Sequence, residues 1–87
     1  METKLKEKAE LLLDFFGFDK SKVEINTEFK PAKGFNITFS TKDEQFIKKL
    51  VGKRGNMANL FRRNFKKLGI INGCNINFYV LPLKQNG

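Results

Sequence analysis

Two glycines bracket two basic residues at Gly52-Lys53-Arg54-Gly55, a tetrad whose composition suits the binding of an anion. Glycine lets the backbone turn without steric cost and lets another backbone approach closely. The N–H groups of such a turn, and the N-terminus of a helix that follows it, donate hydrogen bonds to phosphate oxygens. Lys53 and Arg54 add positive charge at the centre of the tetrad. The pattern therefore predicts non-covalent binding of a phosphodiester.

The same four residues have a plainer interpretation. A Gly-x-x-Gly can be a tight turn between two helices, and basic side chains opposite an apolar stripe are usually a solvated face. The charge distribution favours binding. Residues 1–45 hold all nine acids and eight Lys, a net charge of 8 − 9 = −1, whereas residues 46–87 hold six Lys, three Arg and no acid, a net charge of +9. The excess charge thus lies in the half that contains the tetrad, as expected of a binding surface.

Residues suited to catalysis or to metal binding are scarce. With no His and one Cys, neither an internal disulfide nor a protein-built zinc site is expected. No nucleophile has a recognisable base beside it, and the acids are scattered along the chain. Cys74 is interpreted as a small buried residue of a strand, and the ten Phe as core residues. We predict a binding protein that is not an enzyme and holds no cofactor and no metal.

The length and the apolar runs predict one small soluble domain. Its 87 residues suffice for a single domain that folds alone. The apolar runs are too short to span a membrane. Lys4, Glu7 and Lys8 interrupt the N-terminal segment where a signal peptide would have an apolar block. Together with the single cysteine, these features predict a cytoplasmic protein.

Hydrophobic periodicity predicts six elements around the tetrad. Apolar residues recur at helical spacing in three segments and alternate with polar residues in three others. Gly17 with Phe18 closes the first helix. Thr41 and Glu44 form a capping-box pattern that opens the second helix, and Gly69 ends the third. The expected elements are a helix over residues 3–16, strands over 23–29 and 35–40, a helix over 42–51, the tetrad at 52–55, a helix over 56–68 and a strand over 74–81. This α-β-β-α-α-β order predicts an α+β domain, with a three-stranded sheet covered by helices.

The segment Leu50-Val51-Gly52-Lys53-Arg54-Gly55, placed between two helices, resembles the Gly-x-x-Gly signature of KH domains. The order of elements is similar to the type II KH arrangement, over nearly the whole chain. Small bacterial single-domain KH proteins typically carry Ala and Arg where Ala58 and Arg62 stand. The entry from the first helix into a strand is similar to the KH part of Jag (SpoIIIJ-associated) proteins.

The resemblance implies a module for single-stranded RNA. In KH domains the tetrad clamps the backbone of about four nucleotides, and the bases lie along a groove between the helices and the sheet edge. The residues implied to contact RNA are Lys49, Val51, Gly52, Lys53, Arg54, Gly55, Asn56, Asn59, Arg62 and Arg63. A role as a post-transcriptional or ribosome-associated RNA chaperone or regulator follows from the resemblance. The alternative is a KH-like interaction module, forming a homodimer or a heterodimer with another KH protein, without RNA affinity of its own.

Several of these positions keep two interpretations. Val51 and Ile76 either floor the RNA groove or belong to the ordinary core. Asn56 either offers its amide to a base edge or is the N-cap of the third helix. Residues 67–75 are expected to form the variable loop of the fold, where Ile70 and Ile71 either pack inward or contact a partner.

Overall fold

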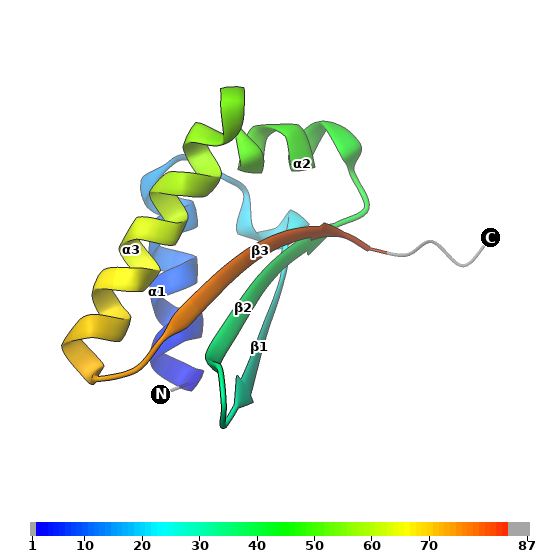
Figure 1. Ribbon diagram of the computed structural model, residues 1–87. Coiled ribbons are helices and arrows are strands. Elements are labelled where there is room, and N and C mark those ends of the chain that lie inside the picture. Colours follow the sequence, from blue (N-terminus) through cyan, green and yellow to red (C-terminus); the bar gives the residue numbers. More distant parts are fainter. Residues whose placement is uncertain (1, 84–87) are drawn as a thin grey trace.

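The computed structural model describes residues 2–83 (Figure 1). They form three α-helices and a three-stranded mixed sheet, which confirms the predicted α+β class. The helices are α1 (Glu2–Phe15), α2 (Glu44–Val51) and α3 (Asn56–Asn72), the strands are β1 (Glu24–Lys30), β2 (Gly34–Thr41) and β3 (Ile76–Pro82), and two 3₁₀ turns are η1 (Lys20–Lys22) and η2 (Lys53–Gly55). None of the helices within residues 2–83 has the length and apolar character needed to cross a membrane.

The central strand of the sheet is β2. It pairs antiparallel with β1, which follows from the short β1–β2 connection, and parallel with β3. Two parallel strands need a long crossover, and the crossover here consists of residues 42–75, which contain α2, the tetrad and α3. The tetrad consequently lies at one end of the domain, far from the β1–β2 turn at the other end (Figure 1).

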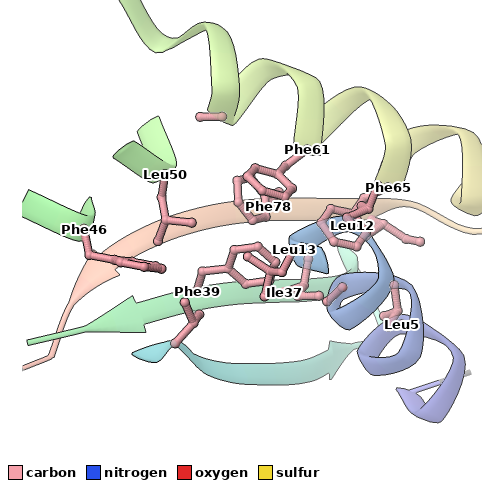
Figure 2. Close-up of a cluster of buried hydrophobic side chains, with 14 residues drawn as sticks. Leu5, Leu12, Leu13, Ile37, Phe39, Phe46, Leu50, Phe61, Phe65 and Phe78 are labelled. Atoms are coloured by element: carbon pink, nitrogen blue, oxygen red, sulfur yellow. The ribbon is translucent and has the colours of Figure 1, made fainter. Parts of the chain in front are cut away.

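The helices pack on one face of the sheet, and aromatic rings fill the space between them (Figure 2). Phe39 of β2 lies in the middle of this core, with its ring centroid 4.9 Å from that of Phe78 and 5.2 Å from that of Phe61. The apolar faces of the strands and of the helices thus pack together in one core. The interpretation of all ten Phe as core residues is nevertheless wrong for two of them, because Phe15 and Phe29 are exposed.

The end of α1 has the predicted closing contact. The N–H of Phe18 donates to the Leu13 carbonyl at 2.8 Å, and the N–H of Gly17 donates to the Asp14 carbonyl at 3.1 Å. These two bonds satisfy the last helical carbonyls. Phe18 then packs partly buried against the core, 5.7 Å from the ring of Phe46.

The start of α2 differs from the prediction. Asp43 is the N-cap, and its carboxylate accepts hydrogen bonds from the N–H groups of Gln45 and Phe46 at 2.9 and 3.3 Å. The capping box at Thr41 is therefore wrong, and the helix begins at Glu44 rather than at residue 42. The reason is that Thr41 is still the buried last residue of β2, paired in register with β3.

The end of α3 also differs from the prediction. Gly69 lies inside the helix, which continues to Asn72, and Gly73 is the C-cap. A Cβ at Gly69 would lie 2.5 Å from the Cys74 carbonyl oxygen, so this glycine allows a close approach rather than stopping the helix. The N–H of Cys74 donates to the Gly69 carbonyl at 2.9 Å in the closing turn. The variable loop expected over residues 67–75 shrinks to 73–75, and the last strand begins at Ile76 rather than at residue 74.

Candidate nucleic-acid interface

The tetrad forms a tight turn between α2 and α3. Gly52 ends α2, with its N–H donating to the Lys48 carbonyl at 2.8 Å, and adopts φ 77° and ψ 175°. Arg54 (φ 57°, ψ 26°) and Gly55 (φ 77°, ψ 12°) are both left-handed. Arg54 is the one non-glycine residue with positive φ within residues 2–83, a conformation that costs about 1–2 kcal/mol. Within this turn the N–H of Gly55 donates to the Gly52 carbonyl at 3.2 Å, and the N–H of Asn56 donates to the Lys53 carbonyl.

The two glycines of the tetrad are required for different reasons. A Cβ at Gly52 would lie 2.7 Å from the Cβ of Met57, because the end of α2 touches the start of α3 at this point. A Cβ at Gly55 would meet no atom within 4 Å, so only its left-handed backbone favours glycine. The surface above Gly55 is consequently open to a ligand.

The cationic side chains of the tetrad face solvent. Lys53 and Arg54 are both exposed. In the part of the chain that the structure describes, the single ion pair joins Lys20 to Asp14, so no carboxylate neutralises the tetrad. Its positive charge is thus available to a partner.

A hollow of about 400 Å³ opens beside the tetrad. The tetrad and α2 form one end of it, α3 forms one wall and β3 the other. Its lining residues are Val51, Arg54, Gly55, Ala58, Asn59, Arg62, Phe78, Tyr79, Val80 and Leu81. It therefore combines a cationic entrance with a partly apolar floor.

A second hollow continues the first toward the far end of α3. It is lined by Arg62, Lys66 and Ile70 of α3 and by residues 74–79. The two hollows share Arg62, Phe78 and Tyr79. They form one channel, here termed the α3–β3 groove, that follows the outer edge of β3 for about 20 Å, the length of a seven-residue strand.

Arg62 occupies the middle of the α3–β3 groove. Its Nη1 donates to the Asn59 side-chain oxygen at 2.7 Å, which positions the guanidinium against the wall formed by α3. Arg63 does not line the groove and lies instead with Asn59, Arg62 and Lys66 around an adjoining hollow. Of the two arginines implied to contact RNA, Arg62 is the one next to the tetrad's channel.

The remaining predicted residues divide between the groove and its surroundings. Val51 is half-buried and lines the groove, whereas Lys49 and Asn56 are exposed outside it. The N-cap interpretation of Asn56 is wrong, because Gly55 is the N-cap and Asn56 is the first helical residue. Ile76 is 7% exposed and belongs to the core, as its plainer interpretation holds, and it also lines the second hollow.

Tyr79 was not among the residues predicted to form the site. It is 47% exposed and lines both hollows of the groove. The strand pattern contains a signal for this position: Ile76 and Phe78 alternate as buried residues, so Tyr79 must lie out of phase with the core. What the pattern lacks is any indication that α3 packs beside this strand.

No protein-family model matches this chain, and no curated protein matches it. Within residues 2–83, no group of three or more His, Cys, Asp or Glu is placed to hold a metal ion. The charged residues that line the groove are Arg54, Arg62 and Lys66, and all three are cations.

Proposed function

We propose that this chain is a KH-like module of type II order that binds single-stranded RNA and clamps its phosphate backbone with the Gly-Lys-Arg-Gly tetrad. One observation carries the proposal: the tetrad opens directly into the α3–β3 groove. Arg54 and Gly55 line its entrance, and Arg62 lines its middle. A phosphate held at the tetrad would therefore direct the rest of the strand along β3.

The tetrad has two means of holding a phosphate. The N–H groups of Gly52, Gly55 and Asn56 already donate to carbonyls of the chain. The remaining N–H groups of the tetrad and of the first turn of the 17-residue helix α3 would hold the phosphate, at the positive end of the helix dipole. Lys53 and Arg54 add full charges at exposed positions. Arg62 and Lys66 supply further cations along the groove for the phosphates that follow.

The floor of the groove suits unpaired bases. Val51, Ala58 and Val80 present apolar surface, and the exposed ring of Tyr79 offers a face on which a base stacks. The Asn59 oxygen is engaged by Arg62, which leaves the amide NH₂ to donate to a base edge. A duplex keeps its bases stacked inside and cannot use these contacts, so the groove favours a single strand.

In this proposal the protein binds RNA without chemical change, as a cytoplasmic post-transcriptional or ribosome-associated chaperone or regulator. A second candidate is an interaction module without RNA affinity, which forms a dimer with itself or with another KH protein. The outer edge of β3 favours this candidate, because no strand within residues 2–83 pairs with it and an open edge accepts a strand from another chain. Both candidates use the same edge, so a single set of measurements separates them.

The test is binding of the chain to labelled single-stranded RNA, single-stranded DNA and duplex RNA over a salt series. With about four phosphates neutralised, the logarithm of affinity for single-stranded RNA should fall against the logarithm of salt with a slope of about −3. Duplex RNA should bind more weakly. The double variant Lys53→Asp with Arg54→Asp should weaken single-strand binding about tenfold or more while staying folded, because Asp tolerates the left-handed conformation at position 54.

A matched control separates the tetrad from overall charge. Lys30→Asp with Lys33→Asp makes the same change in net charge, from +8 to 8 − 4 = +4. Both positions are exposed, Lys30 at the end of β1 and Lys33 in the β1–β2 turn, at the end of the domain far from the tetrad (Figure 1). Equal losses in both variants would show that only net charge matters, and the clamp would be wrong. A stable dimer in sedimentation, with no RNA bound by the parent chain, would establish the second candidate instead.

A further inference from the structure

A second apolar surface lies between α1 and α3, on the side of α3 away from the α3–β3 groove. It is a hollow lined by Lys8, Leu11, Leu12, Phe15, Phe16 and Asn64, here termed the α1–α3 furrow. The two helices run antiparallel (Figure 1), and the rings of Phe16 and Phe61 join them at 5.4 Å. Asn64 lies two residues from both Arg62 and Lys66, so helical geometry turns it away from the groove that they line.

The furrow exposes more apolar surface than the fold requires. Phe15 is 81% exposed and Leu11 65% exposed, and Leu60, one turn before Asn64 on α3, is 38% exposed. The core contact of α1 is already made by its buried residues Leu5, Ala9, Leu12 and Leu13. A Phe and a Leu left in water lose the stabilisation that burial of their side chains would give. Contiguous exposed apolar residues of this kind mark an interaction site.

The charged residues around the furrow are predominantly basic. Lys8 lines it, Lys4 lies one turn earlier on α1, and Lys67 lies with Leu60 and Asn64 on the same face of α3. Helix α3 contains no acid at all.

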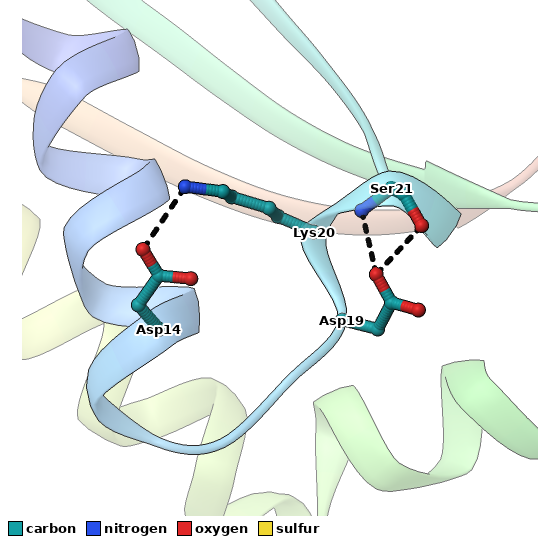
Figure 3. Close-up of polar contacts among 4 residues, drawn as sticks. All are labelled: Asp14, Asp19, Lys20 and Ser21. Atoms are coloured by element: carbon teal, nitrogen blue, oxygen red, sulfur yellow. Dashed lines mark hydrogen bonds and ion pairs between the residues drawn. The ribbon is translucent and has the colours of Figure 1, made fainter.

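Two acids of α1, Asp14 and Glu10, have their contacts elsewhere. Asp14 pairs with Lys20 at 3.0 Å (Figure 3), and Glu10 lines a different hollow beside β1. Glu7 is exposed and lies one turn before Leu11 on α1, at the border of the furrow. The rim on the α3 side of the furrow is therefore wholly cationic.

We infer that the α1–α3 furrow binds an amphipathic helix of a partner protein, with an apolar stripe flanked by acidic residues. The channel between two antiparallel helices accepts a third helix in ridge-and-groove packing. From Lys8 to Phe16 the furrow is about 12 Å long, which matches two helical turns with anchors at i, i+3 or i+4, and i+7. A second copy of this chain is disfavoured, because it would set the same basic rim and a net charge of +8 against the first. The inference does not depend on RNA binding.

The test uses two designed peptides of about 18 residues, long enough for partial helix formation. Both carry Leu at i, i+3, i+4 and i+7, one with Glu and the other with Lys at the flanking positions. By fluorescence anisotropy the Glu peptide should bind the full chain at least tenfold more tightly than the Lys peptide, with a preference that falls as salt rises. Lys8→Glu with Lys67→Glu should reverse this preference.

Matched variants locate the binding surface. Leu11→Ser with Phe15→Ser should weaken binding of the Glu peptide about tenfold or more, whereas Ile70→Ser, at a 71% exposed position on the groove side of α3, should not. All three side chains are largely exposed, so circular dichroism and the thermal midpoint should remain those of the parent. The Leu11 and Phe15 double variant should also keep the parent's affinity for RNA.

Several outcomes would overturn the inference. Equal affinity for the two peptides would exclude a preference for an acidic partner. Loss of binding in Ile70→Ser would show that the peptide binds outside the furrow. A parent dimer that Leu11→Ser with Phe15→Ser dissociates makes the occupant a second copy. Binding of anionic phospholipid vesicles through Phe15, with neither peptide bound, makes it a membrane surface.

Discussion

Gly52 lies against Met57 so closely that the end of α2 and the first turn of α3 leave no room for a side chain between them. A Cβ at Gly52 would stand 2.7 Å from the Met57 Cβ and 2.8 Å from its backbone nitrogen. This contact sets the angle at which α3 leaves the tetrad. Arg62 belongs to the same helix as Met57, so the angle of α3 also sets the position of Arg62 in the groove.

Gly52→Ala should therefore destabilise the domain by at least about 2 kcal/mol, since it adds a steric clash to a backbone conformation that only glycine adopts readily. Gly55→Ala should cost only about 1 kcal/mol, because strain at φ 77° is its single penalty. Urea unfolding of the two variants checks the difference. Equal losses would mean that Met57 yields to the added methyl group.

Arg62→Ala should weaken binding of single-stranded RNA more than Arg63→Ala does, because Arg62 lines both hollows of the groove and Arg63 lines neither. The salt slope should become less steep by about 0.7 in Arg62→Ala, the value for one lost phosphate contact on a single strand. Both side chains are exposed, so stability should not change. A larger effect of Arg63→Ala would place the RNA path on the outer side of α3.

Tyr79 provides an internal reporter of the groove. The chain has one Tyr and no Trp, so its tyrosine emission comes from Tyr79 alone. Single-stranded RNA should quench this emission in parallel with the anisotropy change. Tyr79→Phe should keep the parent's affinity, and Tyr79→Ala should lose about 1–3 kcal/mol of binding free energy, the contribution of one stacked base.

The outcome at Tyr79 also separates two failures. If RNA binds with unchanged emission and Tyr79→Ala keeps full affinity, the proposed stacking on Tyr79 is wrong. The proposed binding of phosphate by the tetrad is not affected by that result. If the parent chain binds no RNA at all, the proposed function itself fails.

The turn before β1 predicts a pH effect. Ser21 donates its hydroxyl and its N–H to the Asp19 carboxylate at 2.6 and 3.0 Å (Figure 3), which lowers the pKa of Asp19 below its ordinary value of 3.8. A lowered pKa stabilises the folded state above pH 3.8, and this contribution disappears as the pH falls through the folded value. Its size should be small, because the group is exposed.

Ser21→Ala should raise the pKa of Asp19 toward 3.8. The part of the acid dependence of stability that comes from the hydrogen bond of the Ser21 hydroxyl should then disappear. Carbon-13 NMR titration of the Asp19 carboxyl, with unfolding measured above and below this pH, checks both expectations. An unchanged titration in Ser21→Ala would show that the hydroxyl is not the cause.

Local patterns were sufficient where a short stretch of chain decides its own conformation. The two-residue alternation defines the strands, and the closing turn at Gly17 and Phe18 involves only residues of that turn and of α1. The tetrad likewise follows from its own sequence, because two glycines around a sharp turn require no distant residue. For these elements the predictions and the structure agree within a few residues.

Distant contacts decided the cases in which local patterns misled. Thr41 resembles an N-cap, but pairing with β3 keeps it in the sheet, and Asp43 caps α2 instead. Gly69 resembles a helix stop, but it lies inside α3, where the lack of a side chain lets the Cys74 carbonyl come close to the helix. In both cases a residue with a strong local preference is held by a partner that the local pattern does not contain.

By itself, the sequence determined the class of fold, the glycine-flanked turn and the half of the chain that carries the positive charge. Only the tertiary structure decided that Arg62 and Tyr79, from α3 and β3, border one groove that opens at the tetrad. Periodicity states which side of each element is apolar, whereas the surface that covers that side depends on how the crossover places α3 beside β3 and α1.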